Sequence, residues 1–463
     1  MRVIIIGEDV SAFVCAITCR RDNLDVIMLE SGQDPETTPG IQIPPNGTYL
    51  LRRLGLLDAV LEKGDILRTI DFRRYADGGV IRSMPCGEET CRVYGGPWIT
   101  IHREDLLQIL RDRARKLGTE IRPATVREVY SDTAEVILED GESLQGDVVI
   151  RADGNLFNGS PSQDTAPERT SSPSTATETE TIYQTTISRK QLEALDNPKI
   201  DELWQGRHST TVWLGPNQHA IFYPVRHGQA FILNIYHTST DSRATTIPTA
   251  QEVCTGWDDR LQTILSLAHT LKPTTLPHHH QEPNEDQQQQ QSSLLTHLPT
   301  QNIPPHQAQE TATAIEDALV LGTLLSLFNQ HQHPQSPHTT THIPSLLTLQ
   351  ATLRAPTTTR KTHSALSTLR TFQLENGIAQ QARDWVLSAA GITRETDWWW
   401  KVVSSRQEGI LSGGLGLVDE TARAFWEWKR ARGPVWKEGE GKGSSVRSSC
   451  GIGGLRRKWY SWC

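Results

Sequence analysis

The sequence lacks the signatures of several protein classes. Basic residues are in the minority, since 46 lysine and arginine residues face 54 acidic ones and the net charge is −8. This balance argues against nucleic acid or an anionic membrane as the main partner. Cysteine is scarce, and an odd number of seven, scattered over 463 residues, does not form a disulfide framework. No stretch approaches the ~20 uninterrupted apolar residues that a membrane span needs.

Recognisable targeting signals are lacking as well. The N-terminal MRVIII is too short for the apolar core of a signal peptide and leads directly into a glycine turn. The C-terminal WYSWC matches no prenylation or peroxisomal signal, because its cysteine is the last residue. We therefore expect a reduced, cytoplasmic protein, and the sequence leaves a homodimer open.

The first 30 residues have the pattern of a nucleotide-binding βαβ unit. Residues 3–6 form an apolar run typical of a buried parallel strand, and residues 11–21 read as a helix. Residues 25–29 read as a second strand, which ends at Glu30. Gly7 lies in the turn between the first strand and the helix, where a dinucleotide-binding fingerprint has its first glycine. The pattern predicts an α/β fold with a parallel sheet.

Other local signals extend this pattern. A helix is expected to begin near Glu104 and to end before Gly118, because acids at its start and a glycine past its end suit the helix dipole and C-cap preferences. Residues 134–150 indicate a hairpin with an Asp-Gly turn and then a buried strand. Residues 211–237 alternate like antiparallel strands, which predicts a second, sheet-based domain. Residues 310–328 predict an apolar helix.

Composition marks the segments without regular structure. Residues 156–180 have the composition of a linker. The run LPHHHQEPNEDQQQQQSS cannot bury a core, and its histidines 278–280 indicate a flexible polar tract rather than a metal site. Eight of the 13 tryptophans lie from Trp398 onward, so aromatic packing is concentrated late in the chain.

Five segments, in order along the chain, carry a resemblance to a known family. They read GIQIPPNGTYLLRRLGLLDAVLEKG, ITIHREDLLQIL, GDVVIRADG, WLGPNQHAIFYPVR and IPPHQAQETATAIEDALVLGTLLS. Together they resemble the salicylate-hydroxylase-like group of FAD-dependent aromatic monooxygenases, which have the p-hydroxybenzoate hydroxylase fold. The resemblance implies an α/β protein whose Rossmann-like FAD-binding domain carries an inserted antiparallel-sheet substrate domain and C-terminal helices.

The resemblance also implies how the chain is divided. The expected parts are the first part of the FAD-binding domain (1–180), the substrate-binding sheet domain (181–270), a low-complexity disordered segment (271–293), the second part of the FAD-binding domain (294–385), a C-terminal helical region (386–440) and a disordered tail (441–463).

Several residues receive cofactor roles from the resemblance. Glu30 would accept hydrogen bonds from the adenosine ribose of FAD, as an acid about 20 residues past the glycines does in such folds. Gly40 would let the backbone approach the cofactor. Arg103 would reach FAD from the start of its helix, and Asp153 would lie near the cofactor and the nicotinamide path. The plain alternatives are an exposed strand-end acid, a turn glycine, a surface arginine and a turn acid.

The resemblance implies a hydroxylation of an aromatic or polyketide-like small molecule. NADH or NADPH would reduce FAD, and the reduced flavin would activate O₂ for transfer to the ring, while the protein supplies position and electrostatics. Tyr223 would hydrogen-bond a substrate oxygen, with a packing role on the sheet as the alternative. Gln184 stands where relatives that dearomatise phenols have an arginine, and an amide cannot hold a phenolate by charge. His219 and His227 are expected at exposed strand ends rather than as bases.

The fingerprint departs from the family at its second glycine, where this chain has Asp9. Gly7 and Ala12 satisfy the first and third positions. The carboxylate of Asp9 would lie near a diphosphate of like charge, and one such repulsion at ~4 Å and an effective dielectric constant of ~20 costs on the order of 4 kcal/mol. The side chain could instead cap the helix and point away.

Three further departures affect cofactor contacts. Leu298 stands where the family has an acid that contacts the flavin's ribityl–phosphate region, and the strand before it is expected to be replaced by the His/Gln-rich run. Glu310 replaces the glycine at the start of a helix whose N-terminus normally faces the flavin, so its charge would oppose the helix dipole. Arg151 replaces a small residue before Ala-Asp-Gly.

Three functions remain open at this stage. The first is an FAD-dependent, NAD(P)H-using monooxygenase of secondary metabolism. The second is a non-catalytic or flavin-impaired paralogue that acts as a binding or scaffold protein. The third is a flavoenzyme that uses oxidised FAD without hydroxylation. A mispredicted gene model, in which the low-complexity run and tail are translated non-coding sequence, would also explain the departures.

Overall fold

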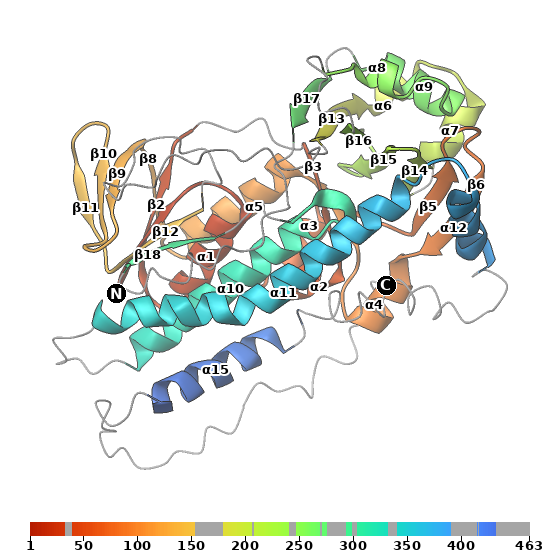
Figure 1. The fold of residues 1–463 in the computed structure, drawn as a ribbon. Helices are drawn as coiled ribbons and strands as arrows, with labels where there is room; N and C mark the ends of the chain where they lie inside the picture. The colour runs from red at the N-terminus through yellow and green to blue at the C-terminus, as the bar shows by residue number, and fades with distance from the viewer. Residues whose placement is uncertain are drawn as a thin grey trace, which may run out of the picture.

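The computed structural model describes residues 1–32, 39–152, 179–205, 208–239, 247–268, 271–275, 293–298, 303–331, 340–389, 414 and 416–431. Figure 1 shows two lobes joined by long helices. One lobe holds a five-stranded sheet, called sheet A, and the other a seven-stranded sheet, called sheet C. Helices α10 (Glu310–Gln330) and α11 (Ile343–Phe372) run side by side between them. The mixed α/β fold class is confirmed.

Sheet A is parallel and begins with the predicted βαβ unit. Strand β1 (Arg2–Ile6), helix α1 (Val10–Arg21) and strand β2 (Asp25–Glu30) follow one another, and β1 pairs in parallel with β2. The strand order is β18-β12-β1-β2-β8. The other members are β8 (Glu120–Pro123), β12 (Val148–Arg151) and β18 (Leu295–His297).

Strand β18 corrects one expectation. The sequence predicted that the strand before Leu298 had been replaced by the His/Gln-rich run. Leu295–His297 instead pairs in parallel with β12, and the N–H of Leu298 donates to the carbonyl of Arg151 at 2.8 Å. Three residues are enough to form this strand because β12 already presents an edge for pairing. So short a strand leaves no recognisable pattern in the sequence.

The helices of this lobe are buried. In α1 every residue from Val10 to Cys19 is buried, and this helix packs against α10 and against α5 (Arg103–Lys116). Helix α10 is long and apolar enough to cross a membrane by length and composition, but 83% of its most apolar window is buried inside the protein. We therefore interpret α10 as a core helix, because helices that are apolar all round belong inside large cores.

A three-stranded sheet and a hairpin sheet complete this lobe. Strands β3, β7 and β4 form the order β3-β7-β4, and the predicted Asp-Gly hairpin is confirmed within the order β11-β10-β9. The bounds are β3 (Gly40–Ile43), β4 (Asp65–Ile66), β7 (Ile99–His102), β9 (Val126–Tyr130), β10 (Glu135–Leu138), β11 (Ser143–Gln145), α2 (Pro45–Arg53), α3 (Leu57–Leu61) and α4 (Gly87–Tyr94).

Sheet C joins strands from distant parts of the sequence, in the order β17-β13-β16-β15-β14-β5-β6. The predicted hairpin strands β14, β15 and β16 pair antiparallel, but β14 also pairs in parallel with β5, which comes from residues expected in the first domain. The bounds are β5 (Thr69–Arg74), β6 (Val80–Pro85), β13 (Thr179–Ser188), β14 (Ser209–Gly215), β15 (Gln218–Val225), β16 (Ala230–Ser239) and β17 (Lys272–Thr275).

Short helices cover the outer face of sheet C, and further helices close the chain. Within residues 271–293, where the sequence predicted disorder, Lys272–Thr275 forms the edge strand β17 against β13; the histidine tract at 278–280 lies outside the described residues. The remaining bounds are α6 (Arg189–Glu193), α7 (Pro198–Trp204), α8 (Ala250–Val253), α9 (Asp259–Ser266), the 3-10 helices η2 (Pro305–Gln307) and η3 (Thr340–His342), α12 (Ile378–Ala389) and α15 (Leu417–Ala431).

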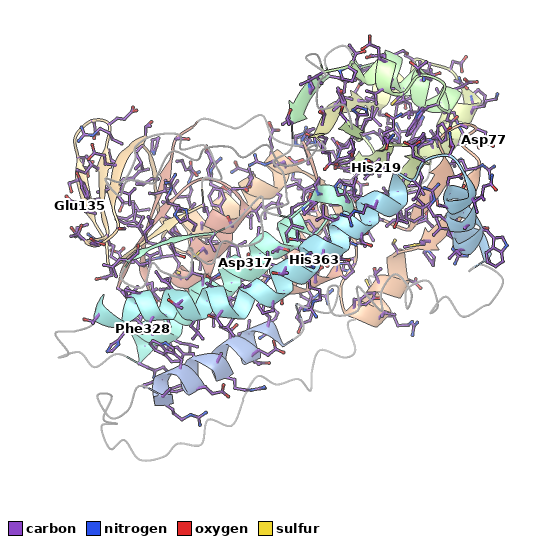
Figure 2. The ribbon with its side chains drawn as sticks, viewed as in Figure 1. Asp77, Glu135, His219, Asp317, Phe328 and His363 are labelled. Carbon is purple, nitrogen blue, oxygen red and sulfur yellow. The ribbon has the colours of Figure 1, made fainter. Side chains whose placement is uncertain are left out.

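A buried cluster of charges joins α10 to α11. The ammonium of Lys361 donates to Glu316 Oε2 at 2.8 Å, and the guanidinium of Arg354 donates to the same oxygen at 2.6 Å and to Asp317. The amide of Asn46 donates to Glu316 Oε1 at 2.7 Å. Burial alone raises the pKa of Glu316, but Lys361 and Arg354 outweigh it and lower that pKa to about 2. Figure 2 labels Asp317 at this interface.

Replacing Lys361 by methionine tests the cluster. Lys361 and Glu316 are both fully buried, so the substitution leaves a buried carboxylate with one cation fewer. Removing one partner of a buried ion pair destabilises a protein by about 3 kcal/mol or more. Urea denaturation should show this loss in the free energy of unfolding. Lys116→Met, at the exposed end of α5, is the control and should change it by less than about 0.5 kcal/mol. Equal effects of the two substitutions would contradict the account.

Candidate functional site

The turn between β1 and α1 has the form of a dinucleotide-binding turn. Gly7 has φ of 126°, a region that only glycine adopts readily, and its N–H donates to the carbonyl of Leu29 at 3.0 Å. Ala12 is fully buried in the first turns of α1. The N-cap residue of α1, Asp9, makes no side-chain capping hydrogen bond. The first N–H groups of this helix therefore face the turn with the positive end of the helix dipole.

Asp9 is turned toward an arginine rather than toward the helix. It is the N-cap residue of α1 but makes no capping hydrogen bond, and its carboxylate lies 3.2 Å from the guanidinium of Arg103. Glu30, at the end of β2, accepts a hydrogen bond from Arg111 at 3.1 Å, and Glu8 lies 3.7 Å from the same guanidinium. Three acids around the turn thus face two arginines.

Helix α5 positions both arginines. It begins directly after β7, and the N–H of Arg103 donates to the carbonyl of Pro39 at 2.9 Å. Arg111 lies eight residues on, close to two helical turns, so both side chains leave the same side of α5. The guanidinium of Arg111 also stacks over the ring of Phe13 at 5.5 Å. Arg103 is buried, which excludes the plain surface role.

Position 40 has no room for a side chain, because sheet C packs closely against it. A Cβ atom at this position would lie 2.4 Å from Ile232 Cγ1 and 2.7 Å from the hydroxyl of Tyr223. Strand β3 therefore contacts sheet C directly at Tyr223. The sequence analysis expected Gly40 to let the backbone approach the cofactor. Among the described residues, the groups that come close to Gly40 are the side chains of Ile232 and Tyr223.

Tyr223 and Gln184 lie on the same face of sheet C, which we call the inner face. Gln184 pairs in register with Asn234, and Asn234 with Ile221, two residues before Tyr223 on β15. Gln184 is half-buried, whereas Tyr223 and Asn234 are buried. Burial raises the pKa of Tyr223, and its hydrogen bond to Asn234 only partly offsets that rise. The tyrosine is therefore a neutral hydrogen-bonding group.

His219 corrects the sequence-based expectation of an exposed strand end. It is fully buried on the inner face, and its ring stacks on Tyr236 with centroids 4.6 Å apart. The amide of Gln373, just after α11, lies 3.1 Å from His219 Nδ1. Figure 2 labels His219 in the lobe of sheet C, where the end of α11 reaches it. His227 is exposed, as expected.

A second buried histidine was missed by the sequence reasoning. His306, in η2, lies with its ring centroid 5.4 Å from those of His219 and Tyr236, and its Nε2 lies 3.2 Å from Glu180. The sequence gave no signal for it, since a histidine directly after two prolines, Pro304 and Pro305, reads as a loop residue. Among the described residues, no group of three or more His, Cys, Asp or Glu side chains could hold a metal ion.

Glu310 lies where α10 begins and faces the same side chains. Burial raises its pKa from the ordinary 4.5 to about 7, although its own backbone N–H lowers it slightly. Its charge in turn raises the pKa of Tyr223 and of Tyr236, so the carboxyl group lies within electrostatic reach of both hydroxyls. The start of α10 therefore presents a group that titrates near neutral pH to the inner face.

The remaining positions from the sequence analysis are Asp153, Arg151 and Leu298. Asp153 lies outside the described residues. Arg151 ends β12, level with Ile6 at the end of β1, and Leu298 is buried directly after β18. The substitution of an acid by Leu298 thus places an apolar side chain at the carboxyl edge of sheet A.

The pKa of Glu310 predicts a pH-dependent stability. Because its folded-state pKa is raised above the unfolded value, the folded protein binds this proton more tightly. The resulting stability is fully present below pH 4.5 and is lost as pH rises through about 7. Relative to Glu310→Gln, the wild type should lose about 2 kcal/mol in free energy of unfolding between pH 5 and pH 8, less than the full linkage value because the residue is partly exposed.

Urea denaturation at several pH values measures this difference. Glu88→Gln, which removes an exposed acid on α4, is the control and should follow the wild-type profile. A profile for Glu310→Gln that runs parallel to the wild type over this range would show that Glu310 does not titrate there.

Comparisons with known proteins place this geometry in a family. No family model matches the chain. The FAD-dependent monooxygenase OpS4 of Beauveria bassiana is 30% identical over 403 residues, which cover 83% of this chain and 88% of that protein. The 3-amino-4-hydroxybenzoate 2-monooxygenase of Streptomyces cremeus is 28% identical over 50% of this chain and 55% of that protein.

Solved structures share the fold. FqzB superposes with a TM-score of 0.64 at 20% identity, covering 84% of this chain and 88% of its own. CtdE, crystallised with FAD and a substrate, gives 0.63 at 18% identity over 88% and 100%. A salicylate hydroxylase–substrate complex gives 0.60 at 16% identity over 90% and 98%. The strand-turn-helix at Gly7, the polar inner face and these relatives lead to one conclusion: the chain belongs to the salicylate-hydroxylase-like group of FAD-dependent monooxygenases.

Proposed function

We propose that this enzyme uses NADH or NADPH and bound FAD to hydroxylate an aromatic or polyketide-like small molecule of secondary metabolism, in the cytoplasm. The observation that carries the proposal is the contact between β3 and Tyr223, because it sets a polar sheet face directly against the nucleotide-binding lobe. The fungal relative is named an FAD-dependent monooxygenase, and the bacterial relative is named for a hydroxylated benzoate.

The residues around Gly7 fit the adenosine diphosphate half of FAD. The N-terminus of α1, which its N-cap residue Asp9 leaves uncapped, would receive the diphosphate, and Gly7 supplies the tight turn that leads into it. Glu30 lies at the end of β2, where it would accept the ribose hydroxyls. Arg103 would contact the diphosphate while it remains paired with Asp9, since a guanidinium has five N–H donors.

The inner face of sheet C would hold the substrate. Tyr223, Tyr236 and Asn234 are linked by hydrogen bonds and stay neutral, so they can orient a polar substituent without adding charge. Gln184 extends this face with a second amide in place of a cation. When bound, the flavin supplies the oxygen chemistry, and these side chains fix the ring position and exclude water.

Spectroscopy and turnover test the proposal in sequence. Protein purified with FAD should show flavin absorbance after desalting, and NAD(P)H oxidation should rise when an aromatic acid such as 3-hydroxybenzoate or salicylate, or a phenol, is added. Incubation under ¹⁸O₂ should place one labelled oxygen in the product. Protein that retains no flavin would support the non-catalytic alternative, and oxidation without labelled product would support a flavoenzyme that does not hydroxylate.

Tyr223→Phe separates positioning from folding in this assay. The substitution removes one hydroxyl from the inner face and leaves the ring in the sheet, so flavin content should be unchanged while product formation falls about tenfold or more. Tyr183→Phe, on the opposite face of the same sheet, is the matched control, because its hydroxyl donates to the carbonyl of Pro248. Equal activities of the two variants would show that Tyr223 has only a packing role.

Removing the charge of Asp9 should strengthen FAD binding. Asp9→Gly deletes one of three carboxylates around the turn and releases the Arg103 donor that now faces Asp9. A gain of about tenfold in affinity corresponds to about 1.4 kcal/mol, well below the unscreened repulsion because Arg103 already offsets part of it. Titration calorimetry with FAD, ADP and adenosine measures the effect, which should appear with ADP and be absent with adenosine.

Asp25→Asn supplies the matched control for this titration. Asp25 is an exposed acid at the start of β2 that pairs with Arg2, far from the turn. Its removal should leave ADP affinity unchanged. Weaker ADP binding by Asp9→Gly would instead mean that Asp9 is needed to orient Arg103.

A further inference from the structure

The hydrogen bonds of Gln373 determine which nitrogen of His219 carries a proton. The side-chain nitrogen of Gln373 lies 3.1 Å from His219 Nδ1 and 3.4 Å from the backbone carbonyl of Tyr236. A carbonyl oxygen only accepts hydrogen bonds, so the atom facing it must be the NH₂ group of the amide. The reversed amide would set two acceptor oxygens against each other.

It follows that His219 Nδ1 is an acceptor. Burial lowers the pKa of His219 well below its ordinary value, and the neighbouring His306 lowers it further, so the ring is neutral. A neutral imidazole has one proton, and with Nδ1 accepting from Gln373 that proton is on Nε2. Nε2 is buried and has no hydrogen-bond partner among the described residues.

The ring cannot easily turn to another orientation. It stacks on Tyr236 at an interplanar angle of 8° and meets the edge of Phe372 at a centroid distance of 5.5 Å. Gln373 is itself anchored, since its N–H donates to the carbonyl of Leu369 and its carbonyl accepts from the N–H of Asn217 at 3.1 Å. The end of α11 thus fixes the amide, and the amide fixes the imidazole.

We propose that Gln373 is a positioning residue that holds His219 as an Nε2–H donor, so that the inner face recognises an acceptor oxygen of the aromatic substrate, a carboxylate or a ring carbonyl. Only the identity of the ligand in this inference rests on the proposed function. A buried N–H without a partner costs free energy, and a ligand oxygen that accepts from it recovers that cost. In this role His219 binds the substrate and does not remove a proton from it.

The groups around His219 fit this role. Tyr236 and Tyr223 are neutral and supply further hydroxyl donors. Glu180 lies against His306 rather than against His219, and Glu310 faces the tyrosines. Because burial raises the pKa of Glu310 to about 7, the inner face carries least negative charge below that pH. Binding of an anionic substrate should therefore strengthen as pH falls from 8 to 6.

Two-bond ¹H–¹⁵N correlation spectra of histidine-labelled protein test the tautomer directly. The signal of His219, assigned by its loss in His219→Gln, should show a protonated Nε2 and an unprotonated Nδ1. Gln373→Glu places a carboxylate against Nδ1, so the proton should move to Nδ1 and the pKa of His219 should rise. Gln218→Glu is the matched control, since Gln218 is on the same strand but donates to Val253 on the opposite side; it should leave the His219 signal in place.

The outcomes decide the proposal independently of turnover. A wild-type spectrum with the proton on Nδ1 overturns it even if Gln373→Glu does not fold, and so does an unchanged tautomer in that variant. Addition of 3-hydroxybenzoate to the flavin-loaded wild type should shift the Nε2–H signal downfield. No shift at saturating probe would overturn the assigned recognition of an acceptor oxygen, whereas a failure to hydroxylate would leave the tautomer result standing.

Discussion

The ion pair between Asp9 and Arg103 lies at the nucleotide turn, and the proposed function depends on it. An acid at the second glycine position of a dinucleotide turn repels a diphosphate unless a cation offsets its charge. Here the cation comes from the first residue of α5, 94 positions along the chain, and a second arginine of the same helix holds Glu30 and Glu8. Asp9 is therefore paired with Arg103 in the folded protein. The departure from the glycine fingerprint at Asp9 does not by itself mean that the turn has lost its form.

Helix α10 connects the lobe of the nucleotide turn with the lobe of sheet C. It packs against α1, which starts at the nucleotide turn, and Glu310 at its own N-terminus lies within electrostatic reach of Tyr223 and Tyr236 on the inner face of sheet C. The buried charges on Glu316, Lys361 and Arg354 bind α10 to α11, and Gln373 lies directly after α11, beside His219. This pair of helices thus runs from the lobe of the nucleotide turn to the lobe of sheet C (Figure 1).

Local patterns predicted the elements well, because strand and helix signals are carried by neighbouring residues. The βαβ unit, α5, the Asp-Gly hairpin and the strands around Tyr223 all followed from periodicity and turn residues. The contacts that define the site did not. Asp9 with Arg103 and Gln373 with His219 join residues 94 and 154 positions apart, and no sequence pattern encodes such pairs. Strand β18 and the burial of His219 were missed for the same reason. The strand forms because the edge of β12 is available for pairing, and His219 is buried because the end of α11 packs against it. The roles of Gly7, Ala12, Glu30, Gly40 and Arg103 toward FAD stay predictions.

A crystal structure of the wild-type protein with FAD tests the account most directly. The account predicts that one guanidinium, that of Arg103, donates to a diphosphate oxygen and to the carboxylate of Asp9 at the same time. A bound cofactor whose diphosphate lies away from Arg103, with the pair to Asp9 unchanged, would contradict it.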